Sequence, residues 1–83
     1  MEEKIELNYV RRIQECVFFY YKICNGCTVA WCPNFMFGME RDTMSEAKDA
    51  LIDEIVDKLR WGFKDIRTVE QVKGYGEVVE VEF

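Results

Sequence analysis

The chain has 83 residues, of which 49% are hydrophobic and 14% are aromatic. This length predicts one small domain with a single core, and the composition excludes wholesale disorder. The formal charge of −5 argues against an autonomous nucleic-acid binder, which needs a basic surface, and favours a basic partner.

The residue types narrow the chemistry further. No apolar run approaches the length of a membrane span, and no signal-peptide pattern opens the chain, so we expect a cytoplasmic protein that does not bind membranes. The four cysteines are then expected to be reduced. Histidine is absent, which removes the commonest general base and the commonest neutral metal ligand.

The first segment is ambiguous. Residues 4–10 alternate as a strand, with Ile5, Leu7 and Tyr9 on one face. Ile5, Tyr9 and Ile13 also lie four residues apart, so a helix through residues 3–14 is the alternative. The following basic pair, Arg11 and Arg12, is expected on the surface.

A hairpin follows. Residues 15–24 are β-branched and aromatic, Asn25-Gly26 is typical of a two-residue turn, and residues 28–32 return as a strand ending at Pro33. This turn would place Ile23 opposite Thr28, Tyr21 opposite Ala30 and Phe19 opposite Cys32. One face would then carry Val17, Phe19, Tyr21, Ile23, Thr28, Ala30 and Cys32, and the other Phe18, Tyr20, Lys22, Val29 and Trp31.

We assign the first hairpin face to a helix, because the small Ala30 at its centre would let a helix approach closely. The second face then leaves Phe18, Tyr20, Val29 and Trp31 without an obvious cover. Exposed aromatic patches of this kind mark interfaces, so these four residues are predicted to bind a partner or a second copy of the chain, as in a dimer. The alternative is that the N-terminal segment covers them.

A helix dominates the second half of the chain. Residues 35–41 form a possible short strand before it. Thr43 and Glu46 make a capping box, in which the Thr43 hydroxyl accepts a hydrogen bond from the Glu46 amide and the Glu46 carboxylate accepts one from the Thr43 amide. Gly62 ends the helix, with Lys58 and Arg60 in its last turn. Apolar residues at helical spacing lie between these signals: Met44, Ala47, Leu51, Ile52, Ile55, Val56 and Leu59, with Phe63 beyond.

The rest of the chain predicts a loop and a last strand. Residues 64–76 mix charges and glycines, with one helical turn near residues 69–72, and residues 77–83 alternate with Val79, Val81 and Phe83 inward. The order strand, strand, strand, helix, strand predicts an α+β fold over residues 1–83, a single domain. It is a two-layer sandwich: a mostly antiparallel sheet of three to five strands, with one main helix on one face.

The run Thr28-Val-Ala-Trp-Cys-Pro33, followed by a short turn and Arg41-Asp-Thr-Met-Ser-Glu-Ala47, resembles the N-terminal domain of the HicB antitoxins. In that family, a strand ending in Ala-x-x-Pro leads to an Asp-Thr-x-x-Glu-Ala helix start. The resemblance covers roughly residues 15–61 and implies a partial RNase H-like fold of order β-β-β-α-β. The departures are Met36-Phe37-Gly38 in place of Pro-Gly, a shorter loop, and Arg41 in place of a glycine. The chain also ends where a typical member continues into a DNA-binding segment, so the resemblance implies the partner-binding half alone.

The cysteines offer a second chemistry. Cys24 and Cys27 form a CxxC pair, the spacing of a zinc knuckle or a redox pair. Cys32 is predicted on the other hairpin face and Cys16 lies far down the strand from Cys24, so we expect no metal site and no cofactor. A Cys24–Cys27 disulfide is sterically conceivable, but free thiols are the expectation.

Carboxylates line one side of the predicted helix: Glu46, Asp49, Asp53 and Asp57. Their ordinary interpretation is a solvated helix face, and the functional one is a negative surface that docks a basic partner or imitates a phosphate backbone. Metal-dependent nuclease chemistry would need carboxylates that converge from the sheet as well. The sheet residues are aromatic and aliphatic, so the chain is not expected to be an enzyme.

Two hypotheses follow. The first is a small antitoxin-like binding protein that inhibits a basic toxin or nuclease, does not bind nucleic acid directly, and forms a homodimer. A phage-encoded inhibitor of a host nuclease or defence complex is chemically equivalent to it. The second is a small thiol or zinc protein that uses Cys24 and Cys27.

Overall fold

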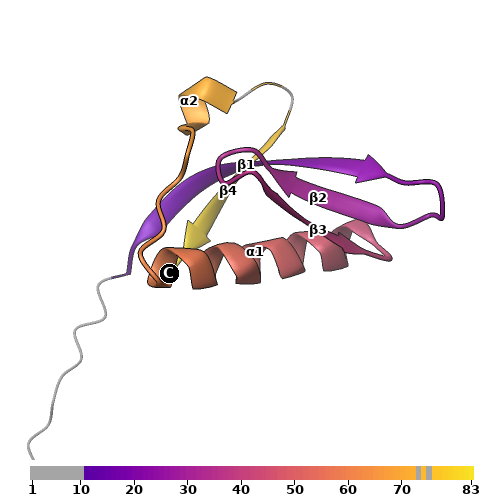
Figure 1. Cartoon of the computed structure of the whole chain (residues 1–83), viewed down its shortest axis with the longest axis horizontal. Coiled ribbons are helices and arrows are strands. Elements are labelled where there is room, and N and C mark those ends of the chain that lie inside the picture. The colour runs from indigo at the N-terminus through magenta and orange to yellow at the C-terminus, as the bar shows by residue number, and fades with distance from the viewer. Residues whose placement is uncertain (1–10, 73, 75) are drawn as a thin grey trace, which may run out of the picture.

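The computed structural model describes residues 11–72, 74 and 76–83. Its elements, in chain order, are β1 (Ile13–Lys22), β2 (Thr28–Cys32), β3 (Phe37–Arg41), α1 (Met44–Arg60), α2 (Val69–Val72) and β4 (Glu77–Glu82). The strands form one antiparallel sheet of order β3-β2-β1-β4. Helix α1 covers one face of this sheet and the short α2 lies on the opposite side (Figure 1). The predicted α+β sandwich and its element order are confirmed.

Helix α1 forms where its local signals predict. The Thr43 hydroxyl accepts a hydrogen bond from the Glu46 amide at 3.2 Å and donates one to the Glu46 carboxylate at 3.0 Å. The carboxylate therefore bonds the Thr43 hydroxyl, where the capping box predicted the Thr43 amide. At the other end, Gly62 has a φ of +89°, and its amide bonds the Leu59 carbonyl while the Phe63 amide bonds the Lys58 carbonyl. This pair of bonds is a Schellman motif, in which glycine ends the helix.

The hairpin register differs from the prediction by one residue. The Gly26 amide bonds the Ile23 carbonyl, the Ile23 amide bonds the Cys27 carbonyl, and Gly26 has a φ of +89°. These features belong to a three-residue loop with a glycine bulge, so Asn25-Gly26 does not form the two-residue turn. The extra loop residue sets Tyr20 opposite Ala30 and Phe19 opposite Trp31. The sequence predicted Tyr21 opposite Ala30 and Phe19 opposite Cys32.

This shift exchanges the two faces of β1 and leaves those of β2 unchanged, because side chains alternate along a strand. Phe18 is fully buried beneath α1 in the core, and Tyr20 packs against the same core. Phe19 and Tyr21 lie on the face away from α1, beside Trp31 and Val29. The prediction that the helix leaves these side chains uncovered is therefore wrong for Phe18 and Tyr20. It is correct for Val29 and Trp31, which lie on the face away from α1.

The core lies between α1 and the inner face of the sheet. Helix α1 buries Ala47, Leu51, Ile55 and Leu59 against Cys16, Phe18, Ala30 and Cys32 of β1 and β2, and against Val79 and Val81 of β4. Ala30 does face the helix, as predicted. Met44 and Phe63, the two ends of the predicted apolar stripe, are exposed.

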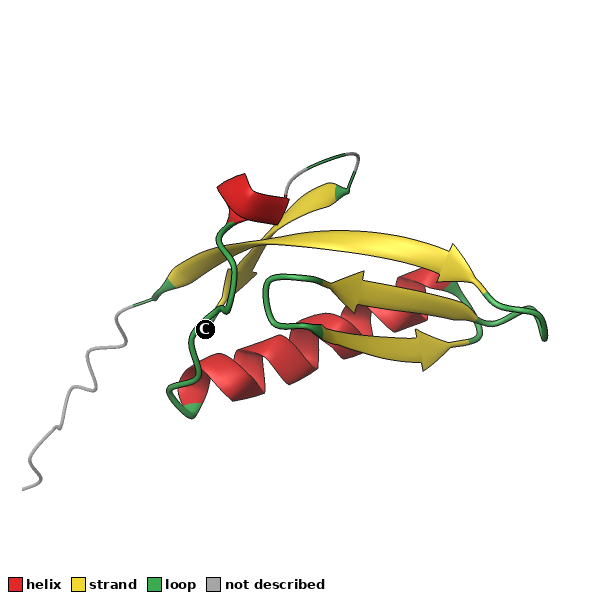
Figure 2. Ribbon diagram, turned by 45° about the horizontal axis from the view of Figure 1, so that its top comes forward, coloured by secondary structure: helices red, strands yellow, loops and turns green. Residues whose placement is uncertain are grey.

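Asn34 joins three segments through its buried side chain. Its Oδ1 accepts a hydrogen bond from the Val17 amide at 2.8 Å, and its Nδ2 donates one to the Arg67 carbonyl at 3.0 Å. Its own carbonyl accepts from the Ile66 and Arg67 amides. Asn34 therefore continues the hydrogen bonding of β1 beyond the end of β2 and holds the α1–α2 connection against the sheet, a path visible in Figure 2.

The N-terminal prediction falls largely outside the described residues, because residues 1–10 are not among them. The part of the helical alternative that is described is not helical, since β1 begins at Ile13. Arg11 and Arg12 are exposed, as predicted. Among the described residues, no helix has the length and apolar character needed to cross a membrane.

Candidate functional surfaces

The carboxylates of α1 form an exposed row on the solvent side of the helix. Glu46, Asp49, Asp53 and Asp57, here called the acidic stripe, are all exposed. From the first to the last, the helix rises about 16 Å. Within the described part of the chain, none of the four forms a salt bridge. The stripe therefore presents its charge to solvent, as the helical spacing predicted.

The outer face of the sheet carries the second candidate surface. Phe19, Tyr21, Val29 and Trp31, here called the outer aromatic patch, come from β1 and β2 and are half-buried or exposed. Trp31 lies against Gly38 of β3, where a Cβ atom would come within 2.8 Å of the indole ring. Glu40 lies opposite Val29 on the same face. The patch is thus an apolar surface with a carboxylate at its β3 edge.

The acidic stripe and the outer aromatic patch face in opposite directions. Helix α1 packs on one face of the sheet (Figure 1). The carboxylates of the stripe lie on the exposed side of α1, opposite its buried residues, and the patch residues lie on the sheet face away from α1. A single flat interface cannot include both surfaces.

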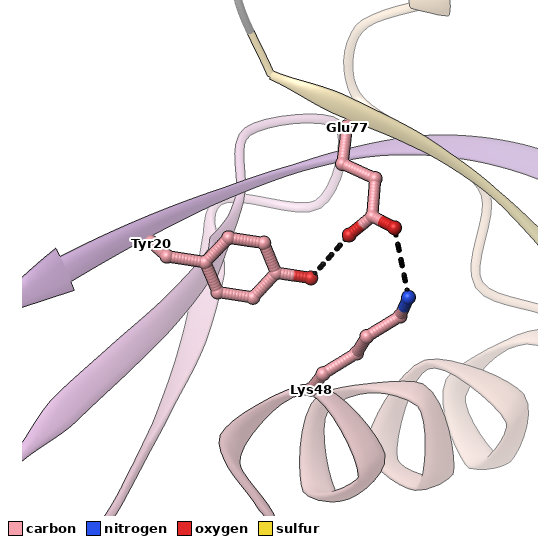
Figure 3. A network of polar contacts seen from close by, with 3 residues as sticks. All are labelled: Tyr20, Lys48 and Glu77. Atoms are coloured by element: carbon pink, nitrogen blue, oxygen red, sulfur yellow. Dashed lines mark hydrogen bonds and ion pairs between the residues drawn. The ribbon is translucent and has the colours of Figure 1, made fainter. Parts of the chain in front are cut away.

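Tyr20 belongs to a polar contact between the sheet and α1 (Figure 3). Its hydroxyl donates to the Glu77 carboxylate at 2.6 Å, and the Lys48 ammonium donates to the other carboxylate oxygen at 2.8 Å. Partial burial and the hydrogen bond to Glu77 raise the pKa of the Tyr20 phenol, and the bonds from Lys48 and Tyr20 lower the pKa of Glu77. A phenol held protonated is a poor nucleophile or base, so this group fastens β1 and β4 to the helix.

The CxxC cysteines lie in the hairpin loop. Cys24 is exposed and Cys27 is half-buried, and both are free thiols. The Cys27 thiol donates to Asp42 at 3.7 Å. Partial burial and the carboxylates of Glu40 and Asp42 raise the pKa of the Cys27 thiol, which opposes thiolate chemistry.

The other two cysteines lie in the core, away from this loop. Cys16 and Cys32 are fully buried and in contact, and the Cys32 thiol also donates to the Asn34 side chain at 3.5 Å. The hydrogen bond with Cys32 and burial raise the pKa of Cys16. The four cysteines therefore do not converge, and the described residues contain no group of three metal-ligating side chains.

A third surface was missed by sequence reasoning. The segment that follows α1 exposes Trp61, Phe63 and Ile66, with exposed fractions of 78%, 61% and 67%. Arg60, Lys64 and Arg67 are exposed among them. We call these six residues the basic–aromatic tip. The signal in the sequence is the alternation of cations and large apolar residues at the end of α1 and just beyond it.

A shallow pocket of about 300 Å³ opens beside this tip, between the end of α1 and the ends of β1 and β4. Its wall combines apolar residues with two cations and one carboxylate: Arg12, Gln14, Leu59, Gly62, Phe63, Lys64, Asp65 and Phe83. The lining contains no nucleophilic side chain paired with a base.

Comparison of the chain with protein-family models, with curated proteins and with solved structures gives no match.

Proposed function

We propose that the protein is a non-catalytic binding domain that inhibits a basic protein acting on nucleic acid, in the manner of an antitoxin. The observation that carries the proposal is the acidic stripe: four exposed carboxylates along one helix, without salt bridges in the described part of the chain. Like charges at this spacing cost a few tenths of a kcal/mol per pair. Glu46 offsets this cost by capping the helix with Thr43, but no such bond to Asp49, Asp53 or Asp57 is seen in the described part of the chain.

The charge of the stripe suits a particular kind of partner. Proteins that act on nucleic acid present basic surfaces to the phosphate backbone, and a row of carboxylates can occupy the same surface. The resemblance of residues 28–47 to the HicB antitoxins supports an inhibitory role. Apart from the short α2, the elements follow the order β-β-β-α-β that this resemblance implies. A phage-encoded inhibitor of a host nuclease would work by the same chemistry.

The experiment compares two variants with equal net charge. Asp49→Asn, Asp53→Asn and Asp57→Asn together neutralise the stripe, and Glu15→Gln, Glu40→Gln and Glu80→Gln together remove the same charge from the outer face. Each variant is used to capture proteins from an extract of the source cell. We purify a basic protein that binds the wild type and the outer-face variant but does not bind the stripe variant. Its association is then measured at two salt concentrations.

We expect the stripe variant to associate roughly tenfold more slowly at low salt, with a flatter salt dependence, because exposed charges steer association. The wild type should also block cleavage of nucleic acid by the recovered protein. If the two variants have equal association rates and equal salt dependence, the stripe does not steer the partner and is only a solvated helix face.

A further inference from the structure

The basic–aromatic tip is an exposed surface that the proposed inhibition does not use. Trp61 has an exposed fraction of 78%, and Phe63 and Ile66 are exposed by 61% and 67%. Three large apolar side chains this exposed within one short segment form a patch, and such patches mark interaction sites.

The backbone of the tip is held at both ends. The Schellman bonds of Gly62 and Phe63 fix its start to the last turn of α1, and the Lys58 ammonium lies over the Phe63 ring at 5.5 Å. The Ile66 amide bonds the Asn34 carbonyl at 2.7 Å, which fixes its far end to the core. A surface ordered before binding loses less conformational entropy in a complex.

The tip also differs in charge from the rest of the molecule. Residues 60–67 contain three cations and Asp65, a net charge of +2, whereas the whole chain carries −5, so the remainder carries −7. An apolar surface edged by cations fits an apolar surface edged by carboxylates.

The outer aromatic patch of the same chain has that chemistry. Its Tyr21 is 53% exposed, beside the half-buried Val29. Val78 of β4, 52% exposed, lies on the same face of the sheet beyond β1. Glu40 lies beside the patch, and farther along the same face Glu15 and Glu80 lie directly opposite each other on β1 and β4. Like charges in directly opposed positions are destabilising, and a cation placed over them would relieve the repulsion.

We infer that the basic–aromatic tip of one copy of the chain docks on the outer aromatic patch of a second copy. Trp61, Phe63 and Ile66 pack on the apolar patch, and the tip's cations approach the glutamates of the outer face. The interface is heterologous, because two different surfaces meet. A pair of copies therefore still has one tip and one patch free, and the assembly grows beyond a dimer or closes into a ring. The acidic stripe takes no part, so this inference does not depend on the proposed function.

The experiment is sedimentation velocity of the full chain from roughly 10 µM to 1 mM, a range suited to a weak, small interface. We expect the wild type to associate, and to do so less in high salt. Trp61→Glu, which blocks the tip, and Tyr21→Glu, which blocks the patch, should each weaken self-association about tenfold or more. Met44→Glu is the matched control, because Met44 is 55% exposed but lies at the other end of α1.

Mixing distinguishes this interface from a symmetric one. Trp61→Glu keeps a working patch and Tyr21→Glu keeps a working tip, so their equimolar mixture should form dimers that grow no further. A wild type that stays monomeric over the whole range would overturn the inference, as would variants whose mixture stays monomeric. The inference would also be overturned if the variant with Asp49→Asn, Asp53→Asn and Asp57→Asn failed to self-associate. A monomeric wild type that binds phosphatidylserine vesicles or single-stranded RNA through Trp61 would assign the tip to that ligand instead.

Discussion

The two faces of the sheet carry similar side chains but are covered to different extents: α1 covers the inner face, whereas the outer face is fully buried at Val17 and exposed at Tyr21. On the inner face, Phe18 and Ala30 are fully buried beneath α1, whereas on the outer face Tyr21 is 53% exposed. Aromatic residues occur in succession on β1 and therefore alternate between the faces. Composition does not show which of these neighbouring aromatic residues is buried. The register of the hairpin and the position of the helix determine it.

The largest expected effect comes from shortening one aromatic residue on each face. Phe18→Ala should cost about 3–5 kcal/mol of unfolding free energy, because it leaves a cavity beneath α1. Tyr21→Ala should change it by only about 0.5 kcal/mol, because an exposed side chain makes few contacts. Urea unfolding of both variants measures the difference. A larger loss in Tyr21→Ala than in Phe18→Ala would contradict the observed register.

A smaller effect is expected from enlarging one residue on each face of β2. Ala30→Leu should cost about 1–3 kcal/mol, because added methylene groups push α1 away from the sheet. Val29→Leu is the matched control on the outer face and should change stability by about 0.5 kcal/mol or less. Thermal unfolding of the two variants tests this. If Ala30→Leu proves neutral, α1 does not pack closely over Ala30.

The smallest effect concerns the contact of Tyr20, Glu77 and Lys48, and it depends on pH. The pKa of Glu77 is lowered from its ordinary value of 4.5 by hydrogen bonds from Lys48 and Tyr20. The folded state therefore favours the ionised carboxylate. Its contribution is complete above pH 4.5 and is lost as the pH falls through the lower folded-state pKa.

Because the Glu77 side chain is 45% exposed, this contribution should be at most about 1 kcal/mol. Unfolding of the wild type and Glu77→Gln is compared at pH 7 and at decreasing pH. The two stabilities should differ at neutral pH and converge in acid, since acid removes the charge that the substitution removes. A difference that stays constant down to pH 3 would assign the effect to packing instead.

Local signals were sufficient for the helix. Thr43, Glu46 and Gly62 act within one or two turns, so the start and end of α1 can be predicted without knowing what it packs against. The acidic stripe follows from the same helical spacing, which places its four carboxylates on the side away from the buried Leu51 and Ile55. Alternation likewise places Val79 and Val81 of β4 inward.

The hairpin required more than local signals. Asn25-Gly26 is compatible with a two-residue turn and with a three-residue loop in which Gly26 is the bulge, and the two differ by one residue in register. The choice depends on which side chains of β1 are buried, and therefore on the helix that arrives later in the chain.

The sequence by itself therefore determined the element order, the ends of α1 and the acidic stripe, because these depend on neighbours a few residues apart. The tertiary structure decided which face of β1 is buried, since burying Phe18 beneath α1 requires contacts between distant segments. It also decided which residues of β1 join Val29 and Trp31 in the outer aromatic patch, because a shift of one residue in register replaces Phe18 and Tyr20 by Phe19 and Tyr21. The exposure of Trp61, Phe63 and Ile66 was decided in the same way, by the bonds that hold their backbone to Asn34 and the end of α1.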